Sequence, residues 1–345
     1  MSGIRTKADP TSARWRISDP VVRVRVMGAE TCFPLDPAKE LIIGTAETSD
    51  IRLADPKGML SRSHARITPQ DGVYTITDLE STNGIKVDGK VGKSFPIAPC
   101  DTVELGGCTL IAESERSIEL HDLLRRLLGW SVAALVEADR ALRVMREVAH
   151  LRAVLIMRGH GSLIGTARRL HEKTLGSERP FSAHDPKETG MVAQERAFDG
   201  TLFLDGEKLP RDVQPVLATL RLPDTRVRVI IGANTAEAAA EVATRINMVA
   251  RLSIPSLSER QDELDRLLEA YGSDAMVPLG APSTGLRPHD LQWIRKGGIK
   301  TLEEAEEIML RVVAVRNWGV TSGAERLGIT HGALSRYMRR HGIPT

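Results

Sequence analysis

A chain of 345 residues is too long for one ordinary hydrophobic core, so we expect two or three domains. The formal net charge is only +2, and lysine and arginine are spread along the sequence. The charge of the whole chain therefore does not indicate DNA binding, and any DNA contact must come from a basic segment within it. The three cysteines are too few and too irregularly spaced for a disulfide framework or a zinc site, and we expect no bound metal. A polar N-terminus, and the absence of a run of about 18 apolar residues, predict a cytoplasmic protein without membrane contact.

The first third of the chain has the pattern of a β-sandwich. We expect residues 1–20 to be disordered and residues 21–113 to form short antiparallel strands, because VVRVRV and VYTIT alternate and Gly, Asp and Asn stand at the joints. After residue 113 the apolar residues recur at helical spacing. We expect residues 114–126 to form a linker to the next domain. This part is therefore predicted to be an all-β domain followed by a connection.

The rest of the chain predicts two further domains. In residues 127–271 the apolar runs AVLIM, GTLFLD and VRVIIGAN alternate with segments whose apolar residues have helical spacing. This alternation is typical of an α/β domain with a buried sheet. Residues 272–300 are rich in Gly, Pro and Ser and are expected to form a linker with a shortened helical lid. Residues 301–345 have helical spacing throughout, so an all-α domain is expected to end the chain.

Three donor-rich loops of the first domain suggest an anion site. They are the turn at Gly44, the SRSH corner at 61–64 and the STNG turn at 81–84, and the loops of a sandwich gather at its ends. Arg62 can fork onto a phosphate, Ser61 and Thr82 offer hydroxyls, and Asn83 offers an amide. The alternative is a purely structural sandwich with ordinary polar turns.

These motifs, with SDIRL at 49–53, resemble those of the forkhead-associated (FHA) domain over residues 21–113. The resemblance implies that Ser61 and Arg62 contact the phosphate of a phosphothreonine, that Thr82 and Asn83 hold the peptide, and that His64 braces the loop. It gives Gly44 and Gly84 structural roles. The family often has an arginine where this sequence has Thr45, and the loss of one of two cations is expected to weaken phosphate binding by roughly 1–3 kcal/mol. The implied partner is a phosphothreonine-containing protein or a Ser/Thr protein kinase.

The stretch VLIMRGHGSLIGTARRLH, residues 154–171, has the layout of a phosphate-binding loop. Such a loop needs a lysine for the phosphates and a following Ser or Thr for magnesium. Residues 127–265 resemble the AAA+ domain of bacterial sigma-54 activators, and on that resemblance the lysine falls on Leu163 and the next residue on Ile164. The charge that would hold a nucleotide is therefore missing.

Other positions of this region also depart from the AAA+ pattern. Asp205 matches the magnesium-linked aspartate of the Walker B strand, but Gly206 follows it, although Glu207 could take the place of the catalytic glutamate. Of the paired family arginines only Arg245 has a clear counterpart, and the loop that grips sigma-54 is absent. We expect a degenerate, shortened domain that is not an enzyme and uses no cofactor. A working ATPase is the alternative.

The last 45 residues predict a helix-turn-helix. Gly328 is a turn residue between helices, and Thr330 is a cap for a helix that ends near His341. From Arg311 onward there are six arginines and one acid. The residues expected to face DNA are Thr330, His331, Ser335, Arg336, Arg339 and Arg340. A solvated basic helix is the alternative.

The same segment resembles the Fis-type helix-turn-helix that ends sigma-54 activators, which implies a recognition helix at 330–340 that binds DNA as a dimer or higher homo-oligomer. Just upstream, the sequence resembles the lid of sigma-54 activators, and Lys300 takes the position of the arginine that senses the nucleotide in that family. The preferred hypothesis is a phosphothreonine-responsive, DNA-binding transcription regulator without ATPase or sigma-54-remodelling activity. The alternatives are a phosphothreonine-binding adaptor whose C-terminal helices dimerise, and an active ATP-dependent sigma-54 activator.

Overall fold

The computed structural model describes residues 17–151, 153–220, 222, 226–244, 246 and 249–345. The expectation of disorder at 1–20 falls for the most part on residues 1–16, which lie outside the described residues. The chain divides into two compact units. The first comprises Met1–Met157, Thr166–Ala233 and Glu237–Leu252, and the second comprises Arg158–Gly165, Asn234–Ala236 and Ser253–Thr345.

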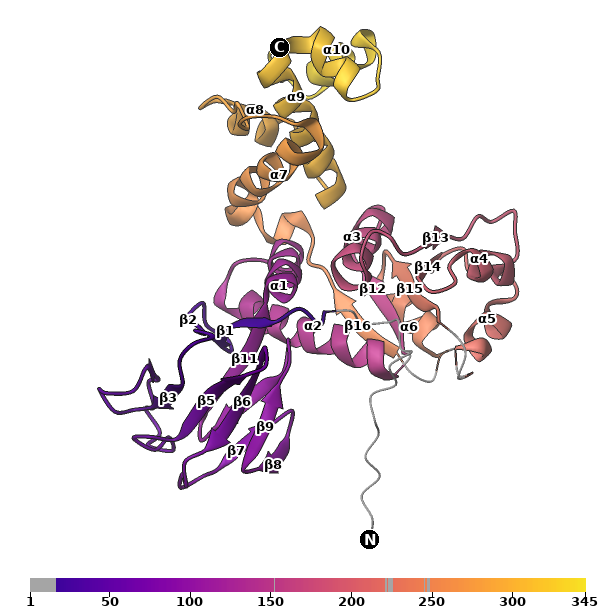
Figure 1. Ribbon diagram of the computed structural model, residues 1–345. Coiled ribbons are helices and arrows are strands. Elements are labelled where there is room, and N and C mark those ends of the chain that lie inside the picture. The colour runs from indigo at the N-terminus through magenta and orange to yellow at the C-terminus, as the bar shows by residue number, and fades with distance from the viewer. Residues whose placement is uncertain (1–16, 152, 221, 223–225, 245, 247–248) are drawn as a thin grey trace. The chain divides into compact units, whose positions relative to one another are not determined.

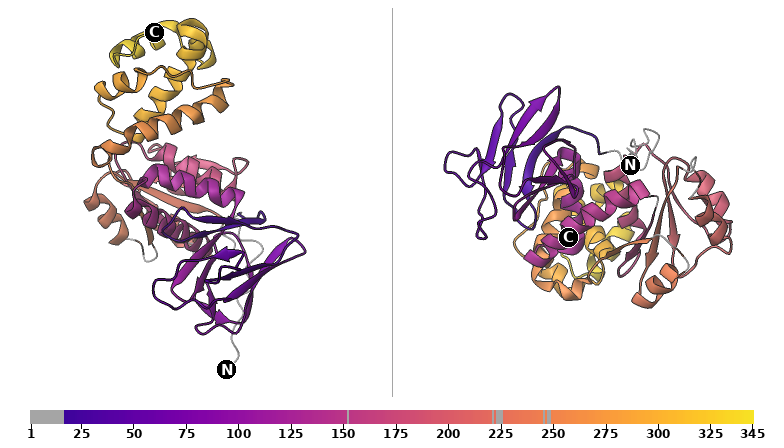
Figure 2. Two further views of the ribbon diagram at one scale, coloured as in Figure 1. Left: turned by 90° about the vertical axis from the view of Figure 1, so that its left-hand side faces the viewer. Right: turned by 90° about the horizontal axis from the view of Figure 1, so that it is seen from below.

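The predicted β-sandwich is confirmed (Figures 1 and 2). One sheet has the order β2-β1-β11-β10-β7-β8 and the other the order β4-β3-β5-β6-β9. Inward side chains of both sheets, such as Ile43, Ile76 and Leu110, form a single buried core. The strands are Val21–Val26 (β1), Cys32–Pro34 (β2), Leu41–Gly44 (β3), Ile51–Arg52 (β4), Ala65–Gln70 (β5), Val73–Asp78 (β6), Ile85–Val87 (β7), Lys90–Gly92 (β8), Ser94–Ile97 (β9), Thr102–Leu105 (β10) and Cys108–Ser114 (β11).

The segment expected to be a linker at 114–126 is largely helical. Helix α1 (Glu115–Leu128) begins where β11 ends, because the Ser114 hydroxyl accepts a hydrogen bond from the amide of Ser117 and the Ser117 hydroxyl accepts one from the amide of Ser114. Leu120, Leu124 and Leu127 are buried at helical spacing. A second helix, α2 (Val132–Leu151), packs against α1.

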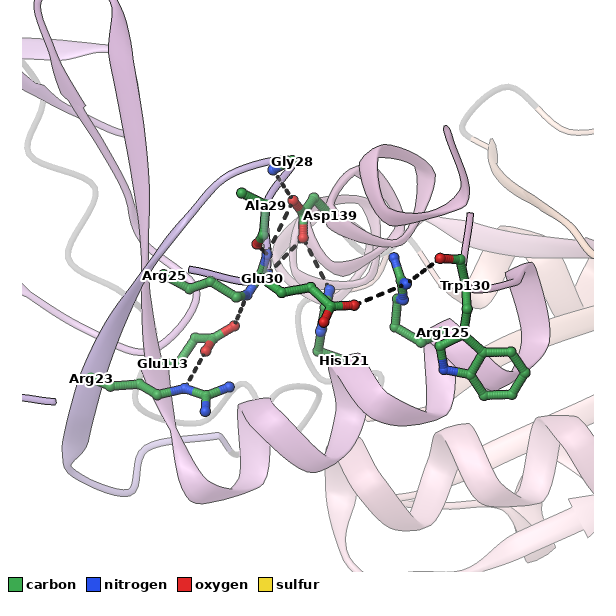
Figure 3. A network of polar contacts seen from close by, with 10 residues as sticks. All are labelled: Arg23, Arg25, Gly28, Ala29, Glu30, Glu113, His121, Arg125, Trp130 and Asp139. Carbon is green, nitrogen blue, oxygen red and sulfur yellow. Dashed lines mark hydrogen bonds and ion pairs between the residues drawn. The ribbon is translucent and has the colours of Figure 1, made fainter. Parts of the chain in front are cut away.

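A buried network of charges attaches α2 to the first sheet (Figure 3). The Arg25 guanidinium donates to Glu113 Oε1 at 2.7 Å and to Asp139 Oδ1 at 2.6 Å. Asp139 also accepts a hydrogen bond from the amide of Gly28 at 2.7 Å, and His121 Nε2 lies 3.0 Å from its Oδ1. The side chains of Glu113 and Asp139 are fully buried. The helix pair is thus tied to the sandwich by ion pairs that water does not reach.

The central region is an α/β layer, as predicted. Its five-stranded sheet has the order β13-β14-β15-β12-β16, with β13, β14 and β15 parallel, and the predicted apolar runs form its buried strands. The elements are Val154–Arg158 (β12), Ile164–Leu175 (α3), Phe181–Ala183 (β13), Gly190–Arg196 (α4), Thr201–Asp205 (β14), Val213–Thr219 (α5), Arg228–Ala233 (β15), Ala236–Thr244 (α6) and Val249–Ser253 (β16).

The last part of the chain is helical (Figure 1). Two short 3-10 turns at Leu257–Glu259 and Gln261–Glu263 precede α7 (Leu264–Leu279), α8 (Asp290–Lys296), α9 (Leu302–Arg326) and α10 (His331–Arg340). Within the segment 272–300, expected to be a linker with a shortened helical lid, residues 272–279 continue α7 and residues 290–296 form α8.

Two features shape these helices. The apolar side chains of α7 recur at spacings of three and four and pack on α9, and this packing outweighs the Gly and Pro content of the segment. The backbone of Gly319 is not helical, with a φ of 72°, so the range of α9 consists of two helices that meet at this residue and precede α10.

Candidate functional site

The glycine turn and the SRSH corner lie against each other at one end of the sandwich. Gly44 is buried, and a Cβ atom there would lie 2.0 Å from the carbonyl oxygen of Arg62, so no larger residue fits without displacing this backbone. The same carbonyl accepts hydrogen bonds from the amide of Ala46 at 3.1 Å and the hydroxyl of Ser49 at 3.2 Å. The amide of Thr45 donates to the carbonyl of Ser61 at 3.2 Å. These contacts hold the backbone of Ser61 and Arg62 in place.

His64 connects this corner to the STNG turn from inside. Its ring is fully buried, and Nδ1 accepts a hydrogen bond from the amide of Ser61 at 3.1 Å. Because Nδ1 accepts, the proton lies on Nε2, which donates to the carbonyl of Gly84 at 3.0 Å. The hydroxyl of Ser81 lies 3.1 Å from the same Nε2 and also accepts from the amide of Gly84 at 3.0 Å. One imidazole therefore sets the spacing of the two loops.

The STNG turn also contacts the SRSH corner directly. The amide of Thr82 donates to the hydroxyl oxygen of Ser61 at 3.2 Å, and the side-chain amide of Asn83 donates to the carbonyl of Met59 at 2.7 Å. Gly84 has a φ of 66°, a left-handed conformation that favours glycine. The Asn83 contact was not predicted from the sequence, since a carbonyl on a neighbouring loop leaves no residue-type signal.

The predicted binding residues thus lie on loops that contact one another. Arg62, Thr82 and Asn83 are exposed, while Thr45 and Ser61 are half-buried. The Arg62 guanidinium has no ion-pair partner among the residues that the structure describes. An unpaired guanidinium beside two hydroxyls and an amide can bind an anion with charge-assisted hydrogen bonds.

The glycine loop after β12 is filled by the protein itself. Leu163 is 7% exposed and packs against Gly159, and α3 begins at Ile164. With its amide oriented to donate, Asn234 reaches the carbonyls of Gly161 at 2.8 Å and Gly159 at 3.2 Å. The side chain of Thr301 lies against Gly161, where a Cβ atom would come within 2.8 Å of its Cγ2. The role of Asn234 and Thr301 was not foreseen from the sequence.

Asp205 and Arg245 complete the predicted degenerate nucleotide site. Asp205 ends β14, and its carboxylate accepts a hydrogen bond from the amide of Glu207 at 3.0 Å. Arg245 lies outside the described residues. Across the described part of the chain, no cluster of three His, Cys, Asp or Glu side chains could hold a metal ion.

Helix α10 presents a basic face. The hydroxyl of Thr330 caps it by accepting from the amide of Ala333 at 3.2 Å, and Leu334 and Met338 are fully buried. Of the residues predicted to face DNA, Thr330, His331, Arg336, Arg339 and Arg340 are exposed and Ser335 is half-buried. The face is anchored to α9 by the Arg311 guanidinium, which lies 3.6 Å from the centre of the Tyr337 ring. Burial raises the pKa of Tyr337 to about 12, so it remains a neutral phenol there.

Comparison with protein families identifies the first site region as an FHA domain. The family profile described as "FHA domain" matches residues 41–106, which include Gly44, the SRSH corner and the STNG turn. The chain therefore contains an FHA domain within its β-sandwich.

Individual relatives each match part of the chain. A chloroplastic zeaxanthin epoxidase of Prunus armeniaca is 37% identical over 86 residues, which are 22% of this chain and 13% of that protein, so the chain spans a small part of its length. The FHA domain of the CT664 protein from Chlamydia trachomatis is 30% identical over 27% of this chain and 95% of its own, with a TM-score of 0.25. A chain from a structural study of phosphothreonine-dependent FHA domain interactions is 27% identical over 28% of this chain and 97% of its own, with a TM-score of 0.26. No helix within the described segments is long and apolar enough to cross a membrane.

Proposed function

We propose that the FHA domain binds a phosphothreonine-containing segment of a partner protein and that the C-terminal helices bind DNA. Phosphothreonine binding is supported by the convergence of four residues at one end of the sandwich: Ser61, Arg62, Thr82 and Asn83. Buried His64 sets the spacing between the SRSH corner and the STNG turn. A Ser/Thr protein kinase would create the phosphorylated segment. The protein is then a transcription regulator that responds to phosphorylation of its partner.

The Arg62→Ala variant tests the phosphothreonine site. The probe is a pool of eleven-residue peptides with a fixed central phosphothreonine, compared with the same pool carrying threonine. We expect the wild-type protein to prefer the phosphorylated pool and Arg62→Ala to bind it about 10-fold to 100-fold more weakly, because charge-assisted hydrogen bonds to the phosphate are lost. Arg66→Ala is the matched control, since Arg66 is a half-exposed arginine of the same domain that lies 3.5 Å from Glu40. Equal binding of both pools by the wild-type protein would contradict the proposal.

The proposal for DNA rests on the charge and exposure of α10. Its exposed arginines have no acidic neighbour on the helix, while Leu334 and Met338 fix its other face on the protein. Exposed arginines on a helix contact phosphates and major-groove edges. An adaptor that uses only the FHA site is the second candidate, since that site alone suffices for capture of a phosphorylated protein.

We further propose that the central α/β region hydrolyses no ATP and serves in packing and self-association. Apolar Leu163 stands where a lysine is needed, and Thr301 and Asn234 occupy the surroundings of the glycine loop. We expect phosphate release from ATP at the background rate for the wild-type protein and for Asp205→Ala alike. Turnover that disappears in Asp205→Ala would overturn this part of the proposal.

A further inference from the structure

The phosphate of a phosphothreonine carries more charge than the three site loops neutralise. At pH 7 that charge is about −1.5 to −2. Within residues 44–49, 61–64 and 81–84, Arg62 is the only lysine or arginine, and Glu47 adds a negative charge. A tight phosphate site at this end of the domain therefore calls for a second cation from outside the loops.

The pairing of β3 and β4 places Arg52 beside the site. These strands are parallel, and Ile43 pairs with Ile51 while Gly44 pairs with Arg52. Both isoleucines are 2% exposed or less and face the core. Since successive side chains of a strand point to opposite faces, Gly44 and Arg52 face outward together.

The backbone of Arg62 crosses that outer face at Gly44. Its carbonyl oxygen lies 2.0 Å from the position that a Gly44 Cβ would take. Paired strands are about 4.8 Å apart, so the Cα atoms of the two arginines lie within roughly 11 Å of each other. Two arginine side chains can converge on one phosphate across that separation.

Arg52 is also available for a ligand. It is exposed, and it forms no ion pair with any residue in the described part of the chain. Asp50, two residues earlier, is already occupied, because its carboxylate accepts from the amide of Ile42 at 2.9 Å and pairs with the Lys39 ammonium group. These hydrogen bonds lower the pKa of Asp50, so it stays ionised and bound to its own partners.

We propose that Arg52 is the second phosphate-binding cation of this domain and acts together with Arg62. The inference rests on the proposed phosphothreonine binding. Arg62 contacts the phosphate from the SRSH corner, and Arg52 neutralises the second negative charge from the edge strand β4. The peptide is thereby recognised as a dianion rather than as a monoanion.

Substitution of Arg52 tests this inference with the same two peptide pools and the full-length protein. We expect Arg52→Gln to bind the phosphorylated pool about fivefold more weakly than wild type at pH 7.5 and low salt, and Arg52→Lys to retain most of the affinity. The loss is expected to shrink at pH 5.5, where the phosphate is mostly a monoanion because its second pKa is about 6.

The control separates this inference from the proposed function. Arg66→Gln removes an arginine from the same outer face, where Arg66 pairs with Ile42 of β3, and it is expected to change the affinity less than about 1.5-fold. Wild-type affinity in Arg52→Gln, or an equal loss in Arg66→Gln, would overturn the role of Arg52 while Arg62→Ala still loses binding. No preference of the wild-type protein for the phosphorylated pool would instead overturn the proposed function itself.

Discussion

The Asp139→Asn variant is expected to lower the free energy of unfolding of the first unit by about 2–3 kcal/mol, because the buried Arg25 guanidinium keeps Glu113 but loses the second of its two carboxylate partners. Asp139 receives hydrogen bonds from Arg25 at 2.6 Å and from the amide of Gly28 at 2.7 Å, and its side chain is fully buried. An asparagine keeps the size of the side chain but loses the charge and one acceptor atom.

The pH dependence of this effect follows from the pKa of Asp139. Burial by itself disfavours the ionised form, but the neighbouring side chains of His121 and Arg25 outweigh it and lower the pKa to about 2. Since the folded pKa lies below the unfolded value, the stabilisation is complete above about pH 4 and is lost as the pH falls toward 2. The stability gap between wild type and Asp139→Asn should therefore narrow by about 2 kcal/mol over that range.

Urea unfolding of the full chain, with hydrogen–deuterium exchange read over residues 132–151, measures this effect. Glu137→Gln is the matched control on the same helix, since Glu137 is exposed and pairs with Arg140 at 2.5 Å. It should change the stability by less than about 1 kcal/mol. Unchanged exchange of α2 in Asp139→Asn would show that the buried network does not attach the helix.

The double variant Arg336→Glu and Arg339→Glu is expected to lose at least about 100-fold in affinity for duplex DNA at 100 mM salt. Each substitution removes a cation and adds an anion beside the DNA phosphates. Both arginines are exposed, whereas Leu334 and Met338 hold the opposite side of α10 in the core, so the fold should persist. Fluorescence anisotropy with a labelled duplex measures the affinity.

The salt dependence of the same binding reports on the number of phosphate contacts. The slope of log K against log salt should become shallower by about 2 in the double variant. The control is Arg295→Glu, which alters an exposed residue of α8 that pairs with Asp265 at 2.6 Å. Equal DNA affinity in wild type and in the double variant would leave α10 as a solvated basic helix.

The sequence was sufficient for the features that depend on local periodicity. Alternation in VYTIT predicted a strand of the sandwich, and in that strand Tyr74 and Ile76 are buried. The cap at Thr330 was predicted as well, and the helix that begins there buries Leu334 and Met338. The candidate binding residues could be named from the sequence because Gly44, Ser61 and Asn83 stand in short loops whose residue types are restricted.

Contacts between residues far apart in the chain, and helix caps of unusual composition, could not be predicted from the sequence. Arg25 and Asp139 are 114 positions apart, and nothing in either local sequence marks them as partners. The helical period after residue 113 was recognised, but the predicted linker at 114–126 did not anticipate the capping box of α1, in which Ser117 stands where Glu or Gln is usual. The end of α7 was missed because Gly272, Ser273 and Pro278 suggest a linker, while burial of Tyr271, Ala275 and Leu279 stabilises a helix.

The most direct test of the account is the selection of genomic DNA fragments from the source organism by the full-length protein at moderate salt. The wild-type protein is expected to enrich a few loci, and the double variant Arg336→Glu and Arg339→Glu is expected to enrich none. No enrichment by the wild-type protein would contradict a DNA-binding regulator and would leave a phosphothreonine-binding adaptor as the function of this chain.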